Sequence, residues 1–257
     1  MVLTLASTGA GRVAAVPAPR PEPLEGEALR ALGTTLVVAP HPDDESLACG
    51  GLMARLGDEG IAVAALLITD GTLSHPGSRR YDARARAALR DAEWDQALSI
   101  LGVAIERRSR LGLVDGDVPL PGDPRFEATM WRCAAAIDRF GPRTVVAPWR
   151  RDAHPDHRAT YVLIRAALAR RRSPLRLLEY AVWAAERGAP EDLPRAGEMR
   201  ILRLDIGSGA DRKRRAIAAH RSQLGEVITD DPNGFTIAPA MRERAERSAE
   251  HFLEALA

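Results

Sequence analysis

The chain has 257 residues, of which 46% are hydrophobic and 28% charged, and its formal net charge is +1. This is the composition of an ordinary soluble globular protein that is long enough to bury a substantial core. A net charge so close to zero creates no overall field that would attract nucleic acid or an anionic membrane surface, so we expect neither as a partner.

Cysteine content and hydropathy limit the compartment. The chain contains two cysteines, Cys49 and Cys133. Two cysteines make neither a disulfide framework nor a thiolate zinc site, so we expect a cytoplasmic protein. No apolar run approaches the roughly 18 residues of a membrane span, and residues 1–12 lack the basic start and apolar core of a signal peptide. We therefore expect neither feature.

The N-terminal residues differ in composition from the rest. Residues 1–33 are rich in Pro, Ala, Gly and Glu, which predicts a flexible arm with at most a short helix over 25–32. From residue 34 onward, apolar strand-like runs alternate with segments of helical spacing. Strands are predicted at 34–39, 61–69, 105–113, 144–148, 175–183 and 200–206. Helices are predicted at 47–57, 81–101, 126–140, 158–171, 211–224 and 239–256.

This alternation predicts an α/β fold with a Rossmann-like, mostly parallel sheet and helices on both faces. The run at 61–69 is almost continuously apolar, as expected of a strand that is covered on both faces. No domain break is visible after residue 34, so we expect a single domain over 34–257 behind the arm at 1–33. In such sheets, sites gather in the loops at the carboxyl ends of the strands.

Two clusters of imidazole and carboxylate lie after predicted strands. The first is His41-Pro42-Asp43-Asp44-Glu45, after the strand at 34–39, and the second is His154-Pro155-Asp156-His157, after the strand at 144–148. A catalytic zinc typically takes three such ligands and keeps a position for water. The two clusters together therefore predict a metal site.

Individual roles follow from the chemistry of the side chains. His41 and Asp44 are close enough on one loop to bind the same ion, and His157 can supply the third ligand. Asp43 lies between the first two ligands in the sequence, and its side chain would point away from them. A carboxylate beside a metal-bound water is a natural general base. Pro155 suits the first position of a helix, so His154 would cap that helix. His154 could also donate a hydrogen bond to the oxyanion of a tetrahedral intermediate.

Two further carboxylates have predicted roles near this site. Asp152 or Asp156 could accept hydrogen bonds from the ligating imidazoles and so orient them. The alternative is that each cluster is a polar loop in which Asp and His cap helices. The presence of both clusters at strand ends favours the metal site. Imidazole and carboxylate suit zinc, iron(II), cobalt and nickel, which leaves the metal open.

The segment 37–45, together with 154–157, resembles the zinc-dependent N-acetylglucosaminyl deacetylases, the PIG-L or LmbE-like family. Further segments resemble that family's later landmarks: 69–71, Arg90 with Glu93, 101–103 and 213–223. The resemblance spans about residues 34–224 and implies a Rossmann-like α/β domain.

The same resemblance implies roles for individual residues. It implies zinc bound by His41, Asp44 and His157. It also implies Asp43 as the general base and His154 as the electrophilic or acid residue. These roles agree with those that the chemistry of the side chains suggests.

Two candidates concern the substrate. The resemblance suggests that Arg90 contacts a hydroxyl or phosphate of the substrate; the alternative is a surface arginine in the arginine-rich run 79–90. Asp115 follows the strand at 105–113 and could hold sugar hydroxyls, or it could belong to an Asp-Gly turn.

We therefore expect a metal-dependent hydrolase that removes an N-acyl group, most simply acetyl, from an amino sugar or glycoconjugate. Its partner would be a small N-acylated molecule, and its cofactor Zn²⁺ or another divalent metal. One alternative is an amidase acting on a non-sugar N-acylated metabolite, and another is a metal-stabilised binding protein without catalysis. A metallophosphoesterase would require more ligands for two metals than the sequence offers.

Overall fold

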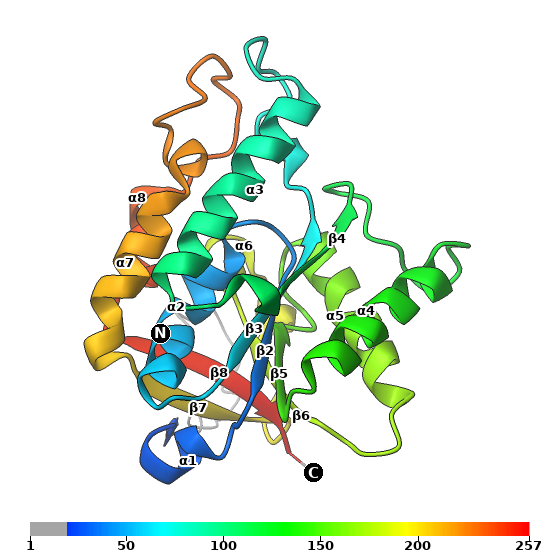
Figure 1. Ribbon diagram of the computed structural model, residues 1–257, viewed down its shortest axis with the longest axis vertical. Coiled ribbons are helices and arrows are strands. Elements are labelled where there is room, and N and C mark those ends of the chain that lie inside the picture. The colour runs from blue at the N-terminus through cyan, green and yellow to red at the C-terminus, as the bar shows by residue number, and fades with distance from the viewer. Residues whose placement is uncertain (1–19, 257) are drawn as a thin grey trace, which may run out of the picture.

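The strands of the protein form one eight-stranded sheet in the order β1-β7-β8-β6-β5-β2-β3-β4. The structure is a computed structural model and describes residues 20–256 (Figure 1). The strands are β1 Glu22–Pro23, β2 Thr35–Ala39, β3 Val63–Thr69, β4 Arg108–Leu113, β5 Thr144–Pro148, β6 Arg176–Tyr180, β7 Met199–Asp205 and β8 Ala249–Ala255. All neighbouring pairs are parallel except those of β8 with β6 and β7. The predicted α/β fold with a mostly parallel sheet is confirmed.

Helices cover both faces of the sheet, with α2, α3 and α7 on one side and α4 and α5 on the other (Figure 1). The helices are α1 Gly26–Arg30, α2 Asp44–Asp58, α3 Ala83–Ile100, α4 Phe126–Phe140, α5 Pro155–Ala169, α6 Ala184–Arg187, α7 Ala210–Ala219 and α8 Pro239–Ala245. Side chains alternate between the faces of β2. Val37 packs into the core under α2 and α3, whereas Leu36 and Val38 pack into the core under α4 and α5. A central strand buried on both faces is therefore apolar throughout.

The strand order determines where the site lies. β2 pairs with β3 on one side and with β5 on the other, all three parallel. The chain runs from β2 through α2 to β3, whereas β5 leads into α5 on the opposite face of the sheet. The loops after β2 and β5 therefore diverge to opposite faces, and this is the kind of position at which parallel sheets open a crevice. Both clusters of histidine and aspartate belong to these two loops.

The prediction of one helix over 239–256 is wrong. The helix ends with α8, and residues Ala249–Ala255 form strand β8, which pairs antiparallel with β6 and β7. Phe252 and Glu250 on this strand are buried, while their neighbours are more exposed. Tertiary pairing has overridden the local preference of an Ala- and Glu-rich segment.

The boundary of the predicted arm also needs correction. Residues 1–19 lie outside the described part, but residues 22–33 belong to the fold. Pro23 and its neighbour pair with β7, and Leu24, Leu29 and Leu32 lie in the core under α2 and α3. The predicted short helix is present as α1. Three leucines supply the apolar surface that lets this proline-rich segment pack.

Other element boundaries shift by a few residues. α2 and α5 begin three residues before their predicted starts, at Asp44 and Pro155. The helix predicted at 211–224 ends at Ala219, and a 3-10 turn, η5, follows at Arg221–Leu224. The earlier starts place parts of both clusters inside the first turns of helices. None of the described helices has the length and apolarity to cross a membrane.

Candidate metal centre and active site

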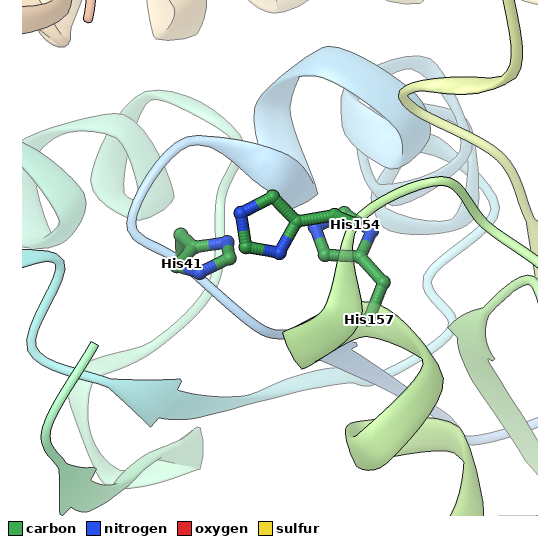
Figure 2. Close-up of side chains that lie close together, drawn as sticks. All are labelled: His41, His154 and His157. Atoms are coloured by element: carbon green, nitrogen blue, oxygen red, sulfur yellow. The ribbon is translucent and has the colours of Figure 1, made fainter. Parts of the chain in front are cut away.

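The two clusters meet at the carboxyl ends of β2 and β5. Figure 2 shows the imidazoles of His41, His154 and His157 turned toward one another, the first from the loop after β2 and the others from the start of α5. The ring centroid of His154 lies 4.6 Å from that of His41 and 5.2 Å from that of His157. Nitrogen atoms of the three rings lie within 4.8 Å of one another, the spacing of groups that can share one ion.

Asp44 connects the other two predicted ligands. Its Oδ2 atom lies 3.2 Å from His41 Nδ1 and 3.2 Å from His157 Nε2. The same oxygen accepts a hydrogen bond from the backbone N–H of His41 at 2.9 Å. Burial raises the pKa of Asp44, but the charges of His157 and His41 outweigh it and hold the pKa well below its usual value. The structure thus brings His41, Asp44 and His157 together.

The chemistry of these donors fits a divalent metal. His157 is fully buried, and its two ring nitrogens face carboxylate oxygens, Asp44 Oδ2 at 3.2 Å and Asp152 Oδ1 at 3.5 Å, in positions that do not meet the geometry of a hydrogen bond. Buried polar atoms are normally satisfied, and a bound metal ion would complete the surroundings of this imidazole. The carboxylates of Asp44, Asp115 and Asp156 surround His41, and although burial lowers the pKa of His41, their hydrogen bonds raise it well above its usual value. This surplus of negative charge would be offset by a cation.

Two more carboxylates contact the two histidines that are predicted to bind the metal. Asp156 Oδ2 lies 3.2 Å from His41 Nε2, and Asp152 Oδ1 lies 3.5 Å from His157 Nδ1. Asp152 also accepts a hydrogen bond from the backbone N–H of His154 at 3.0 Å. Each of the two carboxylates predicted to orient an imidazole therefore faces a different histidine. Such partners fix the tautomer and the ring orientation of metal ligands.

His154 caps α5, as its position before Pro155 predicts. Its Nδ1 atom accepts a hydrogen bond from the backbone N–H of Asp156 at 3.2 Å. Burial and the charges of His41 and His157 lower its pKa to about 4, so the ring is neutral at neutral pH. In a neutral imidazole whose Nδ1 accepts, Nε2 carries the proton. His154 therefore presents an N–H donor beside the cluster.

Asp43 has the most unusual backbone of the site, with φ of 147°. Its side chain is buried, and Oδ2 accepts a hydrogen bond from Arg90 Nη2 at 3.2 Å. Burial raises the pKa of Asp43 to about 6, against the opposing charge of Arg90. A carboxylate with a pKa near this value can both take up and return a proton at neutral pH, as a general base must.

The two residues predicted to contact substrate have contacts within the protein. Arg90 is 3% exposed and donates to the carbonyl oxygens of Gly71 at 2.8 Å and Pro42 at 2.7 Å. Asp115 lies with Oδ1 3.2 Å from His41 Nε2, and its Oδ2 accepts from the backbone N–H of Leu73 at 2.9 Å. In this structure both residues support the cluster directly, and their contact with substrate stays a prediction.

Sequence reasoning assigned no role to a buried network behind Asp43. Glu45 Oε2 accepts a hydrogen bond from the backbone N–H of Asp43 at 3.3 Å, and Glu45 Oε1 lies 3.2 Å from His220 Nε2. Ser46 Oγ also lies 3.1 Å from that nitrogen. The signal for Glu45 was its place at the end of the first cluster, but His220 lies far along the chain, on the turn after α7, and its pairing is visible only in the fold.

Comparison with known proteins assigns the sequence to a family. The sequence model of the PIG-L family, described as GlcNAc-PI de-N-acetylase, matches residues 36–168, which include both clusters. The chain belongs to the PIG-L family. This match confirms the resemblance that the motifs carry.

Relatives of this PIG-L protein include proteins named as deacetylases. It is 31% identical to 2'-N-acetylparomamine deacetylase of Streptomyces fradiae, over 65% of this chain and 59% of that protein. It is 32% identical to diacetylchitobiose deacetylase of Thermococcus kodakarensis, over 48% of this chain and 44% of that protein. The chain thus spans about half the length of these relatives. A solved structure, a conserved protein of Thermus thermophilus, has a TM-score of 0.62 and 29% identity over 86% of this chain and 94% of its own.

Proposed function

We propose that this PIG-L protein is a metal-dependent hydrolase that removes an N-acyl group, most simply acetyl, from an amino sugar or glycoconjugate. The proposal is carried by one cluster, in which Asp44 Oδ2 lies 3.2 Å from a ring nitrogen of both His41 and His157. Ring nitrogens of His41, His154 and His157 lie within 4.8 Å of one another in the same cluster. The family and the named activities of its relatives support the substrate class.

His41, Asp44 and His157 would hold the metal, which we propose to be zinc. A zinc ion held there would supply Lewis-acid chemistry, polarising the acyl carbonyl and lowering the pKa of a water molecule toward about 7. Asp152 and Asp156 would keep the two imidazoles in the orientation that binding requires, through the contacts described above.

The chain's own residues move the protons. Asp43 takes a proton from the attacking water as the new C–O bond forms at the acyl carbon. His154 donates a hydrogen bond from Nε2 to the oxyanion of the tetrahedral intermediate, as its neutral tautomer allows. When the C–N bond breaks, Asp43 returns its proton to the leaving nitrogen, which departs as a neutral amine. The products are a carboxylic acid and the free amino compound.

Two alternatives use the same residues differently. An amidase for a non-sugar metabolite would share the entire mechanism, because loops determine the substrate on a common fold. A binding protein without turnover would have no use for a buried carboxylate in a strained conformation beside the metal. The observation on Asp43 therefore favours an enzyme.

The test measures metal content by elemental analysis together with amine release from N-acetylglucosamine and its simple conjugates. We expect about one metal per chain and release that depends on it. Asp43→Asn should retain the metal and lose at least about 100-fold in kcat, the scale of general-base catalysis. His41→Ala should lose both metal and activity, and Asp211→Asn, an exposed carboxylate of α7, should change neither.

The outcomes separate the hypotheses. Metal without amine release from any N-acylated sugar would leave the site and point to another amide. An unchanged kcat in Asp43→Asn would remove Asp43 as the base. A protein that takes up no metal even after reconstitution would contradict the mechanism and return both clusters to the capping of helices.

A further inference from the structure

A cavity of about 530 Å³ has Trp183 in its lining, and the ring of Trp183 lies 5.9 Å from the ring of His154 in the candidate metal centre. Apolar side chains from three separate segments form about half of its lining: Leu73 and Pro76 after β3, Trp183 after β6, and Phe235, Ala238 and Met241 before and within α8. The other half consists of Ser74, Glu186, Arg187, Asn233, Gly234 and Thr236. Its volume falls within the range of about 300–1,000 Å³ that is typical of small-molecule sites. An acetyl group alone would leave most of this space unfilled.

One wall of the cavity is fixed to the metal centre through Asp152. Asp152 Oδ2 accepts hydrogen bonds from the backbone N–H groups of Val182 at 3.0 Å and Trp183 at 3.3 Å. Its other oxygen accepts from His154 and faces His157, as described above. The ring of Trp183 lies 5.9 Å from the ring of His154. The buried carboxylate of Asp152 thus fixes the position of the wall at Trp183 relative to His154 and His157.

A second wall is fixed through Asp115. Its Oδ2 accepts from the backbone N–H of Leu73, and its Oδ1 lies 3.2 Å from His41 Nε2. Phe235, from the third segment, connects these two walls, because its backbone N–H donates to the carbonyl oxygen of Ser74 and its ring lies 5.4 Å from that of Trp183. Both walls therefore keep a defined position relative to the histidines. A substrate with its amide at the metal centre would extend its remainder into this cavity.

Within this mixed lining, the two aromatic side chains favour contact with a flat, apolar group. The rings of Trp183 and Phe235 lie 5.4 Å apart at 59°, and Leu73, which lines the cavity, is 53% exposed. The two charged side chains of the lining have partners within the protein: the Arg187 guanidinium lies 4.3 Å from the centre of the Trp183 ring, which also lines the cavity, and Glu186 pairs with Arg244. Aromatic walls favour other aromatic rings in offset or edge-to-face contact.

We propose that this cavity is a second subsite, which binds a neutral aromatic or apolar ring carried by the substrate. The proposal rests on the proposed function, because it places the scissile amide at the metal centre. The ring can be attached on either side of that amide, as an aglycone of the amino sugar or as part of the acyl group. The shared chemistry is a flat, uncharged, apolar ring next to an N-acylated amine.

The first experiment compares kcat/KM for three substrates: N-acetylglucosamine, phenyl N-acetyl-β-D-glucosaminide and N-benzoylglucosamine. We expect one of the two aromatic substrates to be preferred over N-acetylglucosamine. Phe235→Ala should reduce that preference about three- to tenfold, the range of one aromatic contact. A preference for the phenyl glycoside assigns the ring to the amine side, and a preference for the benzoyl compound assigns it to the acyl side.

Two further variants make the result interpretable. Phe235→Leu keeps an apolar side chain of similar size and should show a smaller loss of preference than Phe235→Ala. Trp131→Ala removes an aromatic ring that is 47% exposed on α4, on the other face of the sheet, and should leave the preference unchanged. Equal turnover of all three substrates by the native protein would overturn the subsite. So would an equal loss toward all three in Phe235→Ala.

A binding measurement separates this proposal from the proposed function. Phenyl β-D-glucopyranoside has no acyl group, so its binding does not depend on amide hydrolysis. We expect calorimetry to show three- to tenfold weaker binding to Phe235→Ala than to the native protein. Such binding without amine release from any substrate would overturn the proposed function and leave the subsite standing. Amine release without Phe235-dependent binding would overturn the subsite alone.

Discussion

Among single residues, Asp43 carries the strain of the site. A residue other than glycine with positive φ costs about 1–3 kcal/mol and persists only where its surroundings hold it. Here Arg90 binds the carbonyl oxygen of Pro42 and the carboxylate of Asp43, while Glu45 accepts from the Asp43 N–H. These contacts aim the carboxylate and keep the loop in its strained form. We therefore assign Arg90 a positioning role toward Asp43.

Arg90→Lys tests this role. A lysine keeps one positive charge but cannot span Gly71, Pro42 and Asp43 at once with a planar fork. We expect kcat to fall about 10- to 100-fold, because small misplacements of a catalytic group have effects of this size. KM and metal content should change little. Arg84→Lys, an exposed arginine of the same helix, is the matched control. A raised KM with an unchanged kcat would instead return Arg90 to substrate contact.

The residues of the centre differ in how far the sequence predicted them. His41 and Asp44 lie three positions apart on one loop, so local spacing was enough to pair them. His157 required that the ends of β2 and β5 lie side by side, which the strand order shows and the alternation of strands and helices alone does not imply. The contact of Asp115 with His41 and that of His220 with Glu45 could not be predicted, because they join loops whose paths depend on packing.

At the scale of elements, β8 shows where local patterns fail. A strand inserted antiparallel between β6 and β7 has a sequence that suits a helix, and only its neighbours decide its state. The strand also brings a carboxylate into the core. Glu250 Oε1 accepts from Lys213 Nζ at 2.7 Å and from the Gly51 N–H, and Oε2 accepts from the Leu52 N–H, each at 2.7 Å. This contact ties β8 to α2 and α7.

Lys213→Met tests the stabilising role of this contact. Lys213 and Glu250 are 2% and 4% exposed, so the variant leaves a carboxylate buried without its cation. Breaking such a pair from one side costs about 3–5 kcal/mol, which we expect in the free energy of unfolding measured with urea. Arg214→Met removes an exposed cation of the same helix, with half of its side chain accessible, and should cost no more than about 0.5 kcal/mol. Equal losses in the free energy of unfolding of the two variants would show that the buried ion pair stabilises the fold no more than an exposed one.

At the scale of the whole molecule, the proposed metal centre lies between the two layers of helices. Asp44 begins α2, which packs on one face of the sheet, and His157 lies in the first turn of α5, which packs on the other. Their contact crosses the crevice between β2 and β5, where the loops diverge. An ion bound by both Asp44 and His157 would connect the two layers of helices. At this point the contacts within the protein are between buried groups that can carry charge. Metal binding should therefore stabilise the entire fold and not only the loops that supply the ligands.

Thermal unfolding with and without metal measures this coupling. A ligand present at 100 times its Kd stabilises the folded state by about 2.7 kcal/mol, provided that it does not bind the unfolded chain. For a protein of this size, each kcal/mol raises Tm by about 2–4 °C, so we expect zinc to raise Tm of the metal-free protein by roughly 5–11 °C. His41→Ala should lose this increase, because two donors hold the ion less tightly than three. Asp43→Asn should keep it, since Asp43 is assigned to proton transfer. An equal rise in His41→Ala would place the bound zinc elsewhere on the molecule.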